Sequence, residues 1–259
     1  MSKENKTSRI NRNLIIGIGL NTGFTIFEFI VGILSGSLAL VSDAGHNLTD
    51  SLGLIISLSA NKIAARQANQ DKTYGYGRAS IVAALLNAGI LIVLALFIFF
   101  EAYQRIMHPQ PVAGGVVAVV AFLGILANGV NAALFVKDLD DLNIRSAFVG
   151  MFFDTLASVG ALIAGLVILF AHQTLADPLA SILIGIMLLF STWKIIEEAL
   201  HILLEGTPKG INVDLVKELI KSNQLVQDVD DLHIWSISSH YAALSCHIVI
   251  DECVVMPSS

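Results

Sequence analysis

Three residues that can bind a metal ion or a proton stand inside a long apolar run of this sequence. Asp43, His46 and Asp50 occur in "SDAGHNLTDSLGLI", residues 42–55. On a helix His46 and Asp50 share one face, one turn apart, and Asp43 lies on nearly the same side. An imidazole and a carboxylate at this spacing can point at one cation, and this ligand pair suits zinc and similar transition-metal ions. The stretch therefore predicts a cation site in apolar surroundings.

A later apolar segment supplies a candidate third ligand. Its "GMFFDTLASVG" aligns with "HNLTDSLG", so that Asp154 corresponds to Asp50 and Gly150 corresponds to His46. If the two segments cross a membrane in opposite directions, both carboxylates lie roughly 14–16 Å deep, near the middle of an apolar layer about 30 Å thick. His46, Asp50 and Asp154 can then meet. The fourth ligand that zinc prefers is missing, because Gly150 has no side chain.

Placing these polar side chains in lipid costs free energy, and this cost limits the roles that they can have. An ionised carboxylate at the centre of a bilayer costs at least about 2.5–3.5 kcal/mol, so it persists only with partners or beside a cavity. No Lys or Arg is expected at the membrane depth of His46, Asp50 and Asp154 to neutralise them, so a cation or protons must do so. Hydrogen bonding between helices is the simpler role for the other polar residues, which are Asn21, Asn87, Asn128 and Asn131. For Glu28, on the face of Asn21, helix contact and the lining of an access path remain equal alternatives.

The composition and the apolar segments predict the elements that position these residues. The chain of 259 residues is 55% hydrophobic and 14% charged, with a mean hydropathy of +0.74, whereas a soluble domain carries about 25% charged residues. Six segments are long enough to cross a bilayer as helices: 13–34, 38–66, 80–105, 112–136, 146–172 and 177–199. The expected fold class is an all-α membrane protein of six transmembrane helices with a short C-terminal cytosolic α+β domain.

The distribution of positive charge predicts the orientation of the chain. The basic residues that flank the segments are Lys3, Lys6, Arg9, Arg12, Lys62, Arg66, Lys72, Arg78, Arg105, Lys137 and Arg145. They alternate with uncharged links such as 35–37, and positive charge stays on the cytoplasmic side. A multi-pass protein of the cell membrane with both termini in the cytoplasm is therefore expected.

The character of the sequence changes after residue 200. Residues 211–224 are typical of an amphipathic helix, and "VDDLHIWSIS" and "YAALSCHIVID" of two strands joined by a turn. The predicted organisation is a cytosolic segment (1–12), a transport domain (13–200) and an incomplete regulatory and dimerisation domain (201–259). Three elements can hardly close a core alone, so this last domain is expected to lean on a second copy or to be truncated.

Several residues of the last domain could bind a second metal ion. His233 and His247 lie on the expected strands, and Asp251 follows the second one. Nearby residues that could contribute are His240, Cys246 and Cys253. A histidine on a strand is also often only packed. The sequence therefore offers His233, His247 and Asp251 as a candidate cytosolic zinc site and leaves the structural alternative open.

The order of these motifs resembles the cation diffusion facilitators, a family of zinc-exporting proton antiporters. The resemblance is carried by "SLALVSDAGHNLTDSLGL", "YGYGRASIVAALLNA", "LNIRSAFVGMFFDTLASVGALIAG", "ADPLASILIGIMLL", "LLEGTP" and "DLHIWSIS", and it runs from about residue 12 to 251. It implies a homodimer with one tetrahedral zinc site per protomer, built here from His46, Asp50 and Asp154. Gly150 stands where the family usually has His, Lys72 stands where it has another His, and the cytosolic domain normally continues further.

The resulting prediction is a divalent metal efflux transporter, not an enzyme, that exports zinc by proton antiport with alternating access. Asp43 is a candidate for the access path of the metal, or a cap of its helix. Because of Gly150, a transport-impaired subunit and a carrier with selectivity shifted toward manganese or iron remain alternatives. An intramembrane metalloprotease is disfavoured because the sequence has no HExxH motif, and a channel would need rings of like residues. Nothing in the sequence indicates nucleic acid binding.

Overall fold

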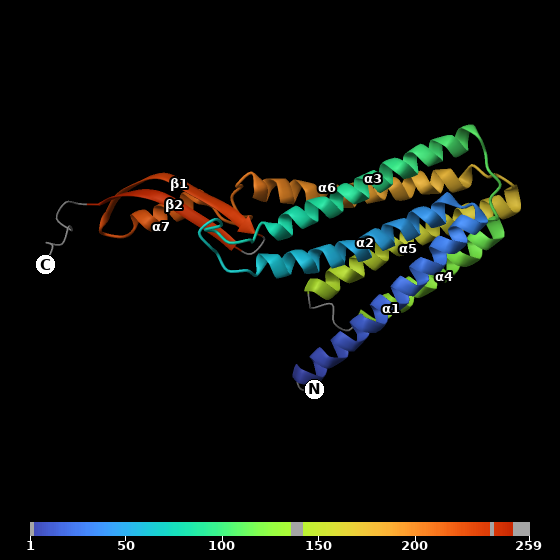
Figure 1. Cartoon of the computed structure of the whole chain (residues 1–259), viewed down its shortest axis with the longest axis horizontal. Helices are drawn as coiled ribbons and strands as arrows, with labels where there is room; N and C mark the ends of the chain where they lie inside the picture. Colours follow the sequence, from blue (N-terminus) through green and yellow to red (C-terminus); the bar gives the residue numbers. More distant parts are fainter. Residues whose placement is uncertain (1–2, 136–141, 239–240, 251–259) are drawn as a thin grey trace. The chain divides into compact units, whose positions relative to one another are not determined.

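The computed structural model describes the backbone of residues 3–135, 142–238 and 241–250, and the side chains of 19–53, 55–133, 150–238 and 241–250. The long helices are α1 (Lys3–Ser35), α2 (Leu38–Ala64), α3 (Ala79–Met107), α4 (Gly114–Phe135), α5 (Leu142–Ala171) and α6 (Ala176–Leu203). A short helix and two strands follow, α7 (Val213–Lys221), β1 (Val226–Ser238) and β2 (Tyr241–Ile250) (Figure 1). The chain divides into two compact units, Met1–Gly53 with Gly89–Thr192 and Leu54–Ala88 with Trp193–Ser259.

The helices correspond to the predicted apolar segments, but α1 begins at Lys3, within the predicted N-terminal segment 1–12 and ten residues before the predicted start of the first helix at 13. Four of the helices are long and apolar enough to cross a membrane. Within the residues whose side chains are described, these spans are Ala79–Met107, Gly114–Ala133, Gly150–Ala171 and Ala176–Leu203. Gly19–Ser35 of α1 forms a shorter apolar helix. The fold is therefore mostly helical with at least four spans, and the full number of six stays a prediction.

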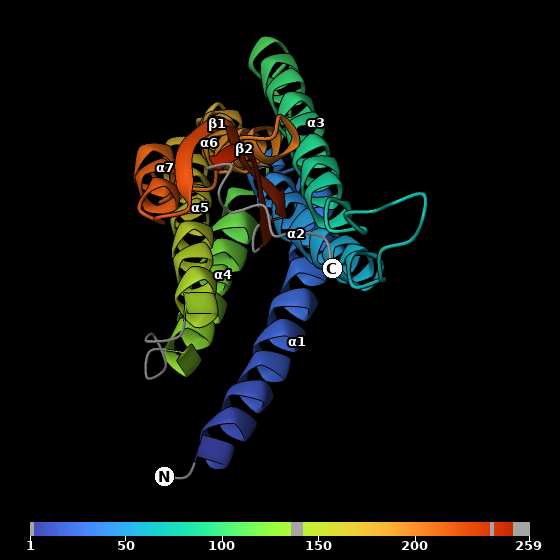
Figure 2. The same cartoon turned by 90° about the vertical axis from the view of Figure 1, so that its left-hand side faces the viewer.

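The core of the first unit packs small residues between helices. Buried residues of α2, α4, α5 and α6 form one apolar cluster: Ala39, Leu40, Val117, Val120, Ala121, Ala157, Ala161 and Ile184. α4 and α5 lie side by side in both views (Figures 1 and 2). A Cβ atom added to Gly165 would lie 2.6 Å from the backbone nitrogen of Ala118. Only glycine therefore allows this close approach of α5 to α4, which is the usual way that membrane helices pack tightly.

The start of α2 is held by a side chain from α6. The Asp177 carboxylate is fully buried and accepts hydrogen bonds from Ser37 Oγ at 2.5 Å and from the backbone N–H of Leu38 at 2.7 Å. Arg105 of α3 lies 3.6 Å from the same carboxylate and also donates to the carbonyl of Gly36. Asp177 thus serves as the N-terminal cap of a helix to which it does not belong, and this fixes the helix that carries the candidate ligands.

The second unit contains the C-terminal elements. β1 and β2 pair in antiparallel fashion to form a two-stranded sheet, and α7 packs on β1 (Figure 2). The side chain of Asn212 caps α7 by accepting from two backbone N–H groups of its first turn. β1 begins at Val226, three residues before the predicted start, and the turn residues 239–240 lie outside the described part of the chain.

Lys221, at the end of α7, tethers this helix to β1. Its ammonium group lies 2.5 Å from Asp228 Oδ1. The hydrogen bond from Lys221 is the main reason that the pKa of Asp228 lies below the ordinary value for an aspartate, and the backbone N–H of Val229 contributes. Because the pair is exposed to solvent, it aligns the helix on the strand more than it stabilises the fold.

Candidate metal site in the helices

The first unit brings the three predicted ligands together. His46 Nε2 lies 3.8 Å from Asp50 Oδ2, one turn further along α2, and 4.0 Å from Asp154 Oδ1 of α5. The imidazole therefore stands between two carboxylates that are far apart in the sequence. The exposed fraction of the side chain is 21% for His46, 16% for Asp154 and 54% for Asp50. The cluster is thus partly buried and opens on the side of Asp50.

The cluster is loose rather than closed around one point. Two ligands of a tetrahedral zinc ion, each about 2.0–2.1 Å from the metal, lie about 3.3 Å apart. The two separations at His46 exceed that value by about 0.5–0.7 Å. Among the side chains described, no group of three His, Cys, Asp or Glu residues is already arranged to hold a metal ion. Binding of a metal therefore requires the side chains of His46, Asp50 and Asp154 to close in.

Space for a further ligand exists at Gly150. This residue lies one turn before Asp154 on α5, so the two positions share a helix face. Among the side chains that the structure describes, a Cβ atom added to Gly150 would meet no atom within 4 Å. The structure thus keeps open the position that a fourth ligand would fill, and a water molecule or a larger side chain could be accommodated there.

Asp43, the candidate for an access path, is a buried residue with an incomplete set of partners. It is 1% exposed, and its Oδ2 accepts a hydrogen bond from Ser158 Oγ of α5 at 3.2 Å. The helix begins at Leu38, so Asp43 lies beyond the first turn and does not cap α2. Within the described residues, Asp43 Oδ1 and His46 Nδ1 are buried without a hydrogen-bond partner. Ser158 was not predicted, because a lone serine in an apolar helix carries no signal of its own.

The donor set determines what the cluster can do. One imidazole nitrogen and two carboxylates suit a divalent transition-metal ion, which would offset the two negative charges. These groups bind a metal only when deprotonated, so protons compete with the metal for His46, Asp50 and Asp154. A site of this kind can therefore exchange a metal ion for protons.

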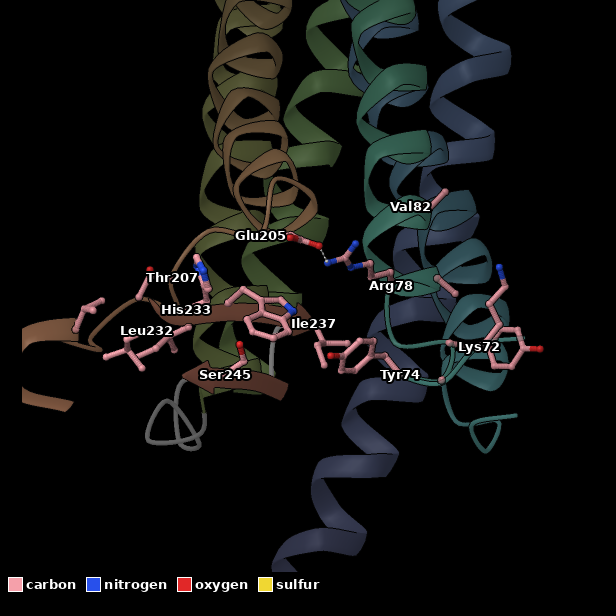
Figure 3. Close-up of a pocket in the computed structure, with 16 residues that line it drawn as sticks. Lys72, Tyr74, Arg78, Val82, Glu205, Thr207, Leu232, His233, Ile237 and Ser245 are labelled. Carbon is pink, nitrogen blue, oxygen red and sulfur yellow. Dashed lines mark hydrogen bonds and ion pairs between the residues drawn. The ribbon is translucent and has the colours of Figure 1, made fainter. Parts of the chain in front are cut away.

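The second unit contains a groove of about 980 Å³ beside β1, shown in Figure 3. Arg78 and Glu205 form an ion pair of 3.1 Å on its wall, and the rings of Tyr74 and Trp235 meet edge to face. His233 lines the same groove. The residues that line this groove thus come from the start of α3 and the loop before it, and from the chain after α6, all within the second unit.

A histidine cluster lies on the two-stranded sheet. His233 Nε2 lies 2.8 Å from Asp231 Oδ1, and His247 Nδ1 lies 3.5 Å from Asp231 Oδ2. A register shift in β1 between Asp230 and His233 and a positive φ of 52° at Asp231 turn this carboxylate toward both imidazoles. Asp251, the predicted partner, lies outside the described residues, and Asp231 was missed because a bulge cannot be read from alternation alone.

Comparison with known proteins shows the family to which this chain belongs. The family model described as "Cation efflux transmembrane domain" matches residues 14–204, and "Cation efflux protein, cytoplasmic domain" matches residues 208–256. The chain belongs to the cation efflux family. This is a family of membrane transporters and not of enzymes, so the chain is a metal cation efflux protein of the membrane.

Relatives with curated names extend over most of the chain. A "Cadmium, cobalt and zinc/H(+)-K(+) antiporter" of Bacillus subtilis is 41% identical over 249 residues, which is 95% of this chain and 80% of the relative. "Zinc transporter ZitB" of Pectobacterium atrosepticum is 40% identical over 230 residues, 88% of this chain and 72% of the relative. "Metal cation efflux system protein CzcD" of Cupriavidus metallidurans is 36% identical over 244 residues, 94% and 77% respectively.

Proposed function

We propose that the protein exports zinc from the cytoplasm in exchange for protons, and that His46, Asp50 and Asp154 bind the transported ion. The supporting observation is the imidazole of His46, which lies within 4.0 Å of a carboxylate from α2 and of another from α5. A mixed nitrogen and oxygen donor set favours zinc over harder ions such as magnesium. Two of the three relatives described above have zinc in their names, which agrees with this choice.

The transport cycle follows from the competition between metal and protons. Zinc enters from the cytoplasm and binds the deprotonated side chains, with a water molecule in the space beside Gly150. The helices then rearrange so that the site faces outward. Protons from outside displace the metal from His46, Asp50 and Asp154, and the protonated site returns inward. The Bacillus subtilis relative is named for exchange with both protons and potassium, and we extend potassium as a second counter-ion to this chain.

The proposal includes the arrangement of the chain in the cell membrane. Six membrane helices within residues 13–200 place both termini in the cytoplasm, and residues 201–259 form a cytosolic domain through which two copies associate. The two family matches, which meet between residues 204 and 208, support this division. The exposed apolar residues of α7 and β2, including Leu215, Leu219 and Leu244, are consistent with a further surface packing on that domain.

A second, cytosolic zinc site at His233 and His247 is proposed with Asp231 as the shared carboxylate and Asp251 as a further ligand. The ion pairs of Asp231 with both imidazoles support it. The side chains are more than half exposed, so this site would respond to zinc in the cytoplasm rather than carry it. Regulation of transport is the role that fits such a position.

Reconstituted vesicles test the main proposal. Zinc uptake is measured with a fluorescent indicator inside the vesicles for the wild type, Asp50→Ala and Gly150→His. The vesicle interior is made acidic, so that protons leave as zinc enters. We expect uptake by the wild type and none by Asp50→Ala. A wild type that moves manganese or iron but not zinc would establish the alternative with shifted selectivity. A wild type inert toward all three, with uptake restored in Gly150→His, would establish the transport-impaired subunit.

A further inference from the structure

A second group of buried polar side chains lies in the first unit, apart from the three zinc ligands. Glu28 of α1 is 1% exposed, and neither of its carboxylate oxygens has a hydrogen-bond partner within the described residues. The same holds for Asp43 Oδ1 of α2 and Thr25 Oγ1 of α1, and both residues are at most 3% exposed. Buried polar groups normally have partners, so this many unmet oxygens in one interior indicates a missing ligand.

The helix faces show that these oxygens share one interior. A Cβ atom added to Gly124 of α4 would lie 3.0 Å from Ser158 Oγ of α5 and 3.3 Å from the ring of Phe24 of α1. Glu28 lies one turn from Phe24 on the same face of α1. Asn131 lies two turns from Gly124 in the other direction along this antiparallel helix pair, so it is not part of the group. Ser158 in turn donates its hydrogen bond to Asp43 of α2.

Glu28 faces negative charge with no described cation to offset it. It lies within electrostatic range of the carboxylates of Asp43 and Asp154. The one Lys or Arg among the described side chains of this unit is Arg105, which is engaged by Asp177 and Glu101. A buried pair of carboxylates without such a partner is strongly unfavourable unless a cation or a proton joins it.

The chemistry of the donors selects the kind of cation. Every unmet atom of Thr25, Glu28 and Asp43 is an oxygen, and carboxylate and hydroxyl oxygens suit hard cations rather than zinc. A proton on each carboxyl group would remove the same charge, so the potassium dependence measured below distinguishes the two occupants. Magnesium retains several waters, which a site this buried does not favour.

We propose that Glu28 and Asp43, with Thr25 and Ser158, form a potassium site that is separate from the candidate zinc ligands. This inference rests on the exchange proposed above and adds the place where the second counter-ion binds. Potassium at this site faces Asp154 and repels a metal ion there, so binding of one cation lowers the affinity for the other. That competition would couple potassium to zinc within a single helix bundle.

Two readouts on the full-length protein test the site, one of which does not depend on transport. The first is the melting temperature of zinc-free protein in detergent, in potassium chloride or in N-methylglucamine chloride of equal ionic strength. The second is zinc uptake by vesicles under a potassium gradient, with the membrane potential clamped, and separately under a pH gradient. The variants are Glu28→Gln and Asp43→Asn. The control is Thr192→Val, which removes a fully buried hydroxyl that bonds only to its own helix.

We expect potassium to raise the melting temperature of the wild type and of Thr192→Val by about 2–4 °C, and that of Glu28→Gln and Asp43→Asn by less than a quarter of this. Potassium-driven zinc uptake should fall at least tenfold in Glu28→Gln, while zinc affinity in detergent without potassium changes less than threefold. Equal potassium stabilisation of Glu28→Gln and wild type would overturn the site, even if zinc is exported. A wild type stabilised by potassium through Glu28 that moves no zinc would instead refute the export proposal and leave the site standing.

Discussion

Two buried polar clusters on α2 differ in how completely their hydrogen bonds are satisfied. At the start of the helix, both oxygens of Asp177 accept hydrogen bonds, from Ser37, Leu38 and Ala39, and Arg105 stands beside them. Further along the same helix, Asp43 and His46 each keep a buried polar atom without a described partner. Satisfied groups hold helices together, whereas unmet groups persist because something else binds them. The contrast supports a structural role for the first cluster and fits the ligand binding that we propose for the second.

The largest expected effect is the loss of transport when a ligand of the second cluster is removed. Asp154→Asn keeps the shape of the side chain but removes a charge that the metal needs, so zinc uptake should fall at least about 100-fold. The melting temperature of the metal-free protein should not fall, because a buried charge has been removed. A melting temperature lowered by many degrees would mean that Asp154 holds the helices, and the contrast between the clusters would be wrong.

Removal of the Asp177 cap should lower stability and spare zinc binding, which is the opposite of the result expected for Asp154→Asn. Asp177→Ala leaves the N–H groups at the start of α2 and the guanidinium of Arg105 without their acceptor, which should lower the free energy of unfolding by about 2–4 kcal/mol. The protein that still folds should bind zinc with nearly unchanged affinity. The matched control is Ser181→Ala on the same helix, which loses one intrahelical hydrogen bond. Unfolding in denaturant and zinc titration measure the two quantities, and a selective loss of zinc affinity would contradict the assignment.

An added ligand should sharpen the second cluster. In Gly150→His an imidazole enters open space one turn from Asp154, so zinc affinity should rise about tenfold and turnover should fall because release becomes slower. Gly150→Ala controls for the change in the helix backbone. Calorimetric titration with zinc gives the affinity. If the affinity is the same in both variants, the side chain at 150 does not face the metal.

Changes in the cytosolic cluster should be smaller. The double variant His233→Ala, His247→Ala leaves the membrane ligands intact, so maximal zinc uptake should change less than about twofold. The zinc concentration for half-maximal uptake should rise a few-fold if the cluster is a sensor. Titration of uptake against free zinc in vesicles separates these two quantities. A complete loss of maximal uptake would place these histidines in the transport path.

The smallest effect is expected at the exposed ion pair of Lys221 with Asp228. Because its pKa is lowered in the folded state, chiefly by the hydrogen bond from Lys221, Asp228 stabilises the fold at neutral pH. This contribution is lost as the pH falls through the lowered pKa. Asp228→Asn should therefore melt slightly below the wild type at pH 7 and together with it in acid. A difference that grows in acid would show that the pair is not the cause.

The sequence was sufficient to predict where the helices lie and that the three candidate ligands meet, because both depend on local periodicity and spacing. The apolar segment 38–66 corresponds to α2, Leu38–Ala64, and the match between Asp50 and Asp154 anticipated that α5 would bring a carboxylate to His46. Expected depth in a membrane is a property that both segments encode separately. A contact between residues at the same depth can therefore be predicted before the packing of the helices is known.

Contacts that depend on rotation or on backbone irregularity were beyond such reasoning. Asp177 was predicted only as the start of a segment, because nothing in "ADPLAS" states that its carboxylate caps another helix. The bond of Ser158 to Asp43 requires the rotation of α5, and Asp231 requires a bulge in β1. These residues are identified only when the helices and strands are placed against one another.

X-ray absorption spectroscopy at the zinc edge tests most directly the central claim that His46, Asp50 and Asp154 bind the metal. The zinc-loaded variant with His233→Ala and His247→Ala lacks both imidazoles of the cytosolic cluster, so the membrane cluster is expected to bind the metal, and the absorption spectrum reports its ligands. The account predicts about one imidazole and three oxygens around zinc, at about 2.0–2.2 Å, with the oxygens from Asp50, Asp154 and water. It also predicts that the signal disappears when Asp154→Asn is added. A shell containing sulfur or several imidazoles, or a signal unchanged by Asp154→Asn, would contradict it.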